Sequence, residues 1–136
     1  MNKTLLFCTS YAESASGWDY RYKKWLSFYE SSPIQKDQIL IIDDGSPFLP
    51  SWHNLQICSL STEKFLPHKH VLFHFEKRLG RHNLFDYPGW YRSFTFEAVW
   101  AQRFQFNKII HIESDTFVLS KKHSKFINDL SNGWTS

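Results

Sequence analysis

Short apolar runs alternate along this chain with longer segments in which apolar residues recur at helical spacing. The first run, 4–8, is followed by apolar and ring-bearing positions between 18 and 29 that recur every three or four residues. A short continuous apolar run indicates a buried strand, and the helical recurrence indicates an amphipathic helix that ends before Pro33. A second run at 38–42 completes a β-α-β unit, which favours parallel pairing of its two strands.

The same alternation continues through the second half of the chain. The strands expected there are 55–59, 71–75, 108–112 and a short edge strand at 116–119, and the expected helices are about 90–106 and 120–130. Asn107 and Gly133 are the expected terminators of these two helices. Alternating buried strands and helices predict an α/β domain with a three-layer α/β/α arrangement and a mostly parallel sheet.

Length and composition narrow the class of protein. The 136 residues suffice for one domain, 1–136, but are too few for two ordinary ones. A content of 42% hydrophobic and 21% charged residues is typical of a soluble globular protein. The net charge of +3 suits an anionic small ligand or an acidic membrane surface, whereas nucleic-acid binding usually needs denser Lys/Arg clustering, so we expect no nucleic-acid partner.

Cysteine usage and the first residues bear on the compartment. Cys8 and Cys58 are the two cysteines, they lie far apart, and they have no metal-type spacing, which predicts reduced thiols. The first apolar run is too short for a signal peptide, and no membrane-spanning segment follows it. We therefore expect a cytoplasmic protein, with peripheral membrane contact left open.

Acidic residues follow two of the predicted strands. Asp43-Asp44-Gly45-Ser46 comes directly after the strand at 38–42, and Glu113-Ser114-Asp115 comes after the strand at 108–112. In parallel α/β sheets, ligands bind outside the carboxyl ends of the strands. Thr9 and Ser10, which leave the first strand, would lie at the same edge. The sequence thus predicts a ligand site there.

Each acidic motif has a structural and a functional interpretation. Asp43 and Asp44 could simply form a tight turn or cap a helix, or one carboxylate could accept hydrogen bonds from a base or ribose. Glu113 and Asp115 could form a solvated strand end, or they could bind Mg²⁺ or Mn²⁺ together with substrate phosphates and water.

Arginines supply the cations that a phosphate would need. Arg81 lies in a loop-like segment, and Arg92 lies near the start of the predicted helix at 90–106. Arginine binds phosphate oxygens bidentately, and a helix N-terminus adds its own positive end. The alternative is that Arg81 is a solvated loop residue and Arg92 a surface helix residue.

Histidines could bind a metal ion, and tryptophans could stack on a bound ligand. His68, His70, His74 and His82 lie close in sequence, but no cysteine or carboxylate completes a zinc spacing, so we interpret them as surface or half-buried residues. Four tryptophans at helical spacings are expected in the core, and two in loop-like sequence are freer to stack on a ligand. The first group is Trp18, Trp25, Trp90 and Trp100, and the second is Trp52 and Trp134.

The order of these motifs resembles that of GT-A glycosyltransferases. A strand and loop, a helix, a strand ending in Asp-Asp-Gly-Ser, a Gly-Arg loop, an Arg-bearing helix and a strand ending in acid-x-Asp follow one another from residue 4 to about 119. The resemblance implies transfer of a sugar from a nucleoside diphosphate sugar, a UDP-sugar in the first instance, to a saccharide, lipid-linked or protein acceptor.

The resemblance also implies roles for individual residues. Thr9, Ser10 and Tyr11 would line the nucleotide pocket, Asp43 or Asp44 would contact uracil or ribose, and Arg81 and Arg92 would face the phosphates. Asp115 would bind the metal, and Glu113 would help to hold the ribose and a metal-bound water. Glu113 stands where the family usually has an aspartate. The acceptor portion and the catalytic base would lie beyond Ser136, so this chain is expected to be the donor-binding part.

Two other classes remain as alternatives. A nucleotidyltransferase uses a related sheet and an acidic metal site, but the loop after the first strand here lacks the Gly-rich, basic character of its phosphate loop. A non-catalytic carbohydrate- or nucleotide-binding module would account for the many aromatic residues, but it would leave the paired acidic strand ends unexplained.

Overall fold

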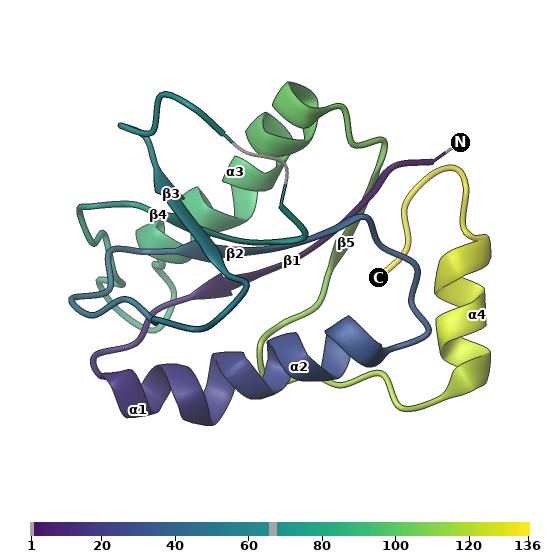
Figure 1. Cartoon of the computed structure of the whole chain (residues 1–136), viewed down its shortest axis with the longest axis horizontal. Coiled ribbons are helices and arrows are strands. Elements are labelled where there is room, and N and C mark those ends of the chain that lie inside the picture. Colours follow the sequence, from purple (N-terminus) through teal and green to yellow (C-terminus); the bar gives the residue numbers. More distant parts are fainter. Residues whose placement is uncertain (1, 66–67) are drawn as a thin grey trace.

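Five parallel strands form one sheet in the order β3-β4-β2-β1-β5 (Figure 1). The computed structural model describes residues 2–65 and 68–136. The strands are β1 Thr4–Ser10, β2 Gln38–Asp43, β3 Gln56–Ser59, β4 His70–His74 and β5 Lys108–His111. The predicted α/β class with a parallel sheet is confirmed.

One long helix connects β1 to β2. It is made of α1 Ala15–Gly17, a π-helical stretch η1 Trp18–Lys23 and α2 Lys24–Ser31, in unbroken succession. Its N-terminus is capped by the Ser14 hydroxyl, which accepts a hydrogen bond from the Gly17 amide at 3.2 Å. The ring-bearing face predicted from the spacing is buried: Trp18 and Trp25 pack with strand residues such as Ile41 in one core cluster.

Helix α3, Pro88–Phe104, connects β4 to β5 and packs against a different set of strand side chains. Leu40 and Phe73 lie with Trp100 in this second core cluster. Their neighbours along the strands, Ile41 and Leu72, lie in the first core cluster with Trp18 and Trp25. Because consecutive strand residues point to opposite faces, both faces of the central strands are covered. This explains why their sequence is continuously apolar and does not alternate.

Several predicted boundaries were wrong. Helix α3 begins at Pro88, because proline is well suited to the first helical turn, and it ends at Phe104. Its C-cap is Gln105, in the left-handed region at φ 60°. Asn107 does not cap the helix as predicted. Its side-chain oxygen accepts a hydrogen bond from the Lys3 amide at 2.7 Å.

The segment after β5 also differs from expectation. Residues 116–119 form no strand: the Val118 amide donates to the Tyr29 hydroxyl at 3.1 Å, so a side chain takes the place of a neighbouring strand. Helix α4, Lys121–Asp129, follows and ends before Gly133, which does not cap it.

Both cysteines are free and buried. Burial raises the pKa of the Cys8 thiol, and it raises the pKa of Cys58 to about 12. The expectation of reduced thiols agrees with this, since buried protonated thiols are inert. No helix in the described parts of the chain combines the length and the apolar character required to span a bilayer.

Candidate functional site

The strand order of the sheet reverses between β1 and β5. From β1 the chain moves to β2 on one side, and β5 is later added on the other side of β1. In open parallel sheets the carboxyl ends of the strands at such a switch point form a ligand-binding crevice. We call this end of the sheet the carboxyl edge. Ser10 and Asp43 are paired in register there, and Glu113 follows shortly after the end of β5.

Two carboxylates are presented to solvent at the switch point. The side chains of Glu113 and Asp115 are 41% and 69% exposed, and Ser114 between them is buried. A hydrogen bond of 3.0 Å from the Thr116 amide to the Glu113 carbonyl closes the turn. The sequence prediction of two acids at a strand end is therefore realised as a tight turn with outward-facing oxygens.

Arg21 links this turn to the long helix between β1 and β2, in which it belongs to the π-helical stretch η1. Its Nε donates to the Ser114 hydroxyl at 2.7 Å, and its Nη2 lies 3.5 Å from the Asp115 carboxylate. The Arg21 side chain is itself 48% exposed. The site thus contains a cation, Arg21, that was not among the candidate residues predicted from the sequence. Its helical position, one turn before Trp25, carried no sign that it would reach residue 115.

Glu113 lies beside an aromatic cluster. The Trp90 indole Nε1 donates to its Oε1 at 3.2 Å, and His111 Nε2 lies 3.5 Å from the same oxygen. Trp90 stacks on Phe94 with 4.8 Å between ring centroids, and it is 36% exposed. The expectation that Trp90 belongs to the core was wrong, because the start of α3 sits at the carboxyl edge.

Burial lowers the pKa of His111, and the neighbouring Glu113 opposes this only in part. The neutral imidazole is therefore favoured in the folded state. An ordinary histidine in the unfolded chain has a pKa of about 6.5. The stability that His111 contributes is fully present above that pH, and it is lost as the pH falls through the lower pKa of the folded state.

We expect urea denaturation to show a midpoint that falls as the pH is lowered from 7.5 to 5, and a smaller fall in His111→Gln. The pKa of His70 is also lowered by burial, so the variant keeps part of the effect. The exposed residue His53 gives the control, since His53→Gln should follow the wild type. Parallel curves for the wild type and His111→Gln would contradict the assignment.

Asp43 faces into the protein. It is completely buried, and its carboxylate accepts four hydrogen bonds from three residues. The Ser10 hydroxyl donates at 3.0 Å, the Ser46 hydroxyl at 2.6 Å, the Ser46 amide at 2.8 Å, and His74 Nδ1 lies at 2.8 Å. Asp43 thus joins the ends of three adjacent strands, a role that the sequence analysis did not foresee.

Asp44 fastens the long loop between β4 and α3 to the end of β2. Its Oδ1 accepts hydrogen bonds from the Leu79 amide at 3.0 Å and from Arg92 Nη2 at 2.6 Å, and its Oδ2 accepts one from the Gly80 amide at 2.8 Å. Arg92 also donates to the Lys77 carbonyl and lies over the Phe75 ring. The predicted cation at position 92 is therefore present at the edge, in an ion pair with the predicted acid.

A stacked pair flanks the end of β1. The guanidinium of Arg78 lies 3.8 Å from the centroid of the Tyr11 ring. Tyr22 holds the Tyr11 backbone in place. The Tyr22 hydroxyl accepts a hydrogen bond from the Tyr11 amide and donates one to the Tyr11 carbonyl oxygen, both at 3.0 Å. Arg78 is exposed, and it was not among the cations predicted from the sequence, where Arg81 was the candidate in this loop. Arg81 is also exposed and lies over the Tyr87 ring at 5.8 Å.

The exposed acids are compatible with a hard cation. Carboxylate oxygens are the ligands that Mg²⁺ prefers, and it usually takes only one or two from the protein. Among residues 2–65 and 68–136, no group of three His, Cys, Asp or Glu side chains is arranged to hold a metal ion. Glu113 and Asp115 would thus need ligands from a substrate.

The two tryptophans expected to be available for stacking differ from each other. Trp52 packs against the core cluster and donates through Nε1 to Asp19 at 2.9 Å, so this expectation was wrong for Trp52. Trp134 is fully exposed, near the end of the chain.

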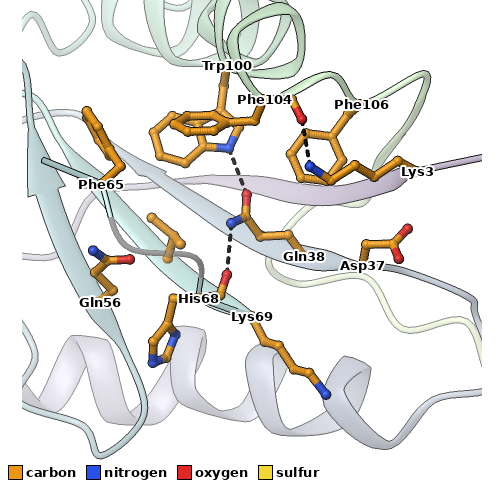
Figure 2. A pocket seen from close by; sticks show the side chains of 11 residues that line it. Lys3, Asp37, Gln38, Gln56, Phe65, His68, Lys69, Trp100, Phe104 and Phe106 are labelled. Atoms are coloured by element: carbon orange, nitrogen blue, oxygen red, sulfur yellow. Dashed lines mark hydrogen bonds between the residues drawn. The ribbon is translucent and has the colours of Figure 1, made fainter.

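A cavity of about 350 Å³ opens at the other end of the sheet, where the strands begin (Figure 2). Its rings are Phe65, Trp100, Phe104 and Phe106. The Gln38 amide in its wall accepts from Trp100 Nε1 at 2.7 Å and donates to the His68 carbonyl at 2.9 Å, so its hydrogen bonds are made within the protein. We place the site at the carboxyl edge, because the exposed acids and arginines are gathered there.

The chain matches no family model, no curated protein and no solved structure. Its function is therefore argued from the geometry of the carboxyl edge.

Proposed function

We propose that this chain has a GT-A-like, three-layer fold and binds the sugar donor of a glycosyltransferase reaction. It would take a nucleoside diphosphate sugar, a UDP-sugar in the first instance, and would serve transfer to a saccharide, lipid-linked or protein acceptor. The observation that carries the proposal is the exposed Glu113–Asp115 turn at the switch point beside the end of β1. Two outward carboxylates beside Arg21 of the helix between β1 and β2 suit a diphosphate and its counter-cation.

In this proposal the nucleotide lies along the end of β1. Thr9, Ser10 and Tyr11 form its wall, and the stacked guanidinium of Arg78 joins Arg81 and Arg92 in a positive rim. Asp43 and Asp44 shape the site by holding its backbone, and Asp44, the less buried of the two, is the one that we propose to contact the base or ribose. No residue of the chain is assigned as the base that would deprotonate the acceptor.

Glu113 and Asp115 would hold the cation, Mn²⁺ or Mg²⁺. The cation supplies neutralisation of the charge that develops on a leaving diphosphate. Arg21 and Asp115 neutralise each other in the structure, and their exposed ion pair is of a kind that contributes at most about 1 kcal/mol. Breaking the Arg21–Asp115 ion pair would therefore cost little free energy. Arg21 could then donate hydrogen bonds to phosphate oxygens, and the Asp115 carboxylate would be free to bind the cation.

Titration calorimetry with UDP and UDP-sugars, with and without Mn²⁺, tests this site. We expect binding that requires the cation and that is weakened at least about tenfold in Asp115→Asn, which removes the ligand charge while keeping its size. Asp129→Asn is the matched control, because Asp129 is also exposed and ion-paired, but lies in α4.

Other outcomes would contradict the proposal. Nucleotide binding that is indifferent to Asp115→Asn would remove the metal assignment, and absence of nucleotide binding would remove the site. A preference for nucleoside triphosphates would favour the nucleotidyltransferase alternative, and carbohydrate binding that persists in EDTA without nucleotide would favour a binding module.

A further inference from the structure

The long loop between β4 and α3 holds two large apolar side chains out in solvent. Leu84 is 67% exposed and Phe85 is 88% exposed. We call these two residues the apolar tip. The segment that carries them follows β4 and precedes α3, and it lies at the carboxyl edge (Figure 1). Scattered apolar residues on a surface need no explanation, but two adjacent ones at the end of a loop do.

The loop is built to keep the tip outward. The His82 amide donates to the Asp86 carbonyl at 2.8 Å, and the side chains of the same two residues meet at 2.8 Å. The Phe85 amide donates to the Asn83 side-chain oxygen at 2.8 Å, and the Tyr87 hydroxyl donates to the Leu84 carbonyl at 2.5 Å. Polar groups of the loop are thus paired with one another, while its apolar side chains contribute nothing to the core.

Other exposed apolar residues and cations surround the tip in sequence. Tyr91 is 50% exposed, and Leu79 and Trp90 are exposed to 37% and 36%. Lys77, Arg78 and Arg81 are exposed cations in the same segment. The acids there are Glu76, which is exposed, and Asp86, whose carboxylate lies 2.8 Å from His82 Nδ1. The segment therefore combines an apolar tip, aromatic rings and three cations against two acids, a formal net charge of +1.

We propose that this segment, residues 76–91, docks on the surface of an anionic phospholipid bilayer. Leu84 and Phe85 would enter the boundary between headgroups and acyl chains, as the apolar residues of peripheral proteins do. Trp90 and Tyr91 have the amphipathic rings that are favoured at that depth, and the three cations face the anionic headgroups. A protein partner would satisfy the apolar residues, but the excess of cations favours a negatively charged surface. The inference needs no nucleotide binding. Arg78 and Arg81 are shared with the proposed nucleotide rim, whereas the side chains of Leu84, Phe85 and Lys77 have no part in that site.

Vesicle flotation tests the proposal with phosphatidylcholine vesicles and with vesicles containing one quarter phosphatidylglycerol. We expect the full chain to float with the anionic vesicles, weakly with the neutral ones, and less at 0.5 M NaCl than at about 0.1 M. The double variant Leu84→Ser/Phe85→Ser should bind at least about tenfold more weakly, because the apolar contribution is lost. Lys77→Gln and Arg81→Gln should each weaken binding about fivefold.

Leu119→Ser is the matched control, because Leu119 is 81% exposed but lies between β5 and α4. It should bind vesicles like the wild type. The tip residues make no core contact, so thermal unfolding of the double variant should match that of the wild type and separate lost docking from misfolding. Failure of the wild type to float, equal flotation with both vesicle types, or unchanged flotation of the double variant would overturn the proposal. Self-association through the tip without vesicle binding would also overturn it.

Discussion

Asp43→Ala should lower the free energy of unfolding by about 3–5 kcal/mol. The substitution removes the acceptor of four hydrogen bonds at a completely buried position. The Ser46 amide cannot turn away, and it would be left buried without a partner. Domains of this size are stable by only about 5–15 kcal/mol, so we expect the thermal midpoint, followed by circular dichroism, to fall by about 10–20 °C.

Two further variants make this result specific. Asp43→Asn keeps the volume and one acceptor oxygen, and it should lose less stability than the alanine variant. Asp129→Ala removes a carboxylate that is 61% exposed and paired with Lys125 on the same helix, and it should change stability by no more than about 0.5 kcal/mol. Equal effects at positions 43 and 129 would show that Asp43 does not join the strand ends.

Gly89→Ala should destabilise the protein by about 3 kcal/mol or more. Gly89 lies in the first turn of α3 against the Asp44 carboxylate, and an added Cβ would overlap Asp44 Oδ2, lie 2.5 Å from its Cγ and lie 2.8 Å from the Gly80 amide nitrogen. The carboxylate cannot yield without giving up Arg92 and the two amides that it binds. Urea denaturation measures the loss.

A second glycine supplies the control. Gly17 has helical dihedral angles, and an added Cβ would come no closer than 3.4 Å to a neighbouring atom, so Gly17→Ala should stabilise the protein by about 0.5–1 kcal/mol. If the clash with Asp44 is the cause at position 89, the cost of Gly89→Ala should be much smaller in an Asp44→Ala background. Additive costs would contradict that cause.

The Asp43-Asp44 motif shows how far a pattern can be interpreted. Both the turn interpretation and the ligand interpretation were open from sequence. In the structure, Asp43 binds His74, which is 31 residues away, and Asp44 binds Arg92, which is 48 residues away. These partners are invisible in a local pattern, because nothing near residue 43 specifies which distant donors will arrive. The resemblance to a ligand-binding motif is therefore compatible with a structural role.

The sequence by itself determined the fold class, the succession of elements and the edge at which acids gather. Strands buried on both faces have to be continuously apolar, and parallel strands have to finish at one edge, so these features follow from local pattern and chain geometry. Only the tertiary structure decided which carboxylates face solvent. Asp43 turns inward because donors from β1 and β4 meet there, whereas Glu113 and Asp115 stay outward on a closed turn beside Arg21. That difference depends on contacts between residues that are remote in sequence.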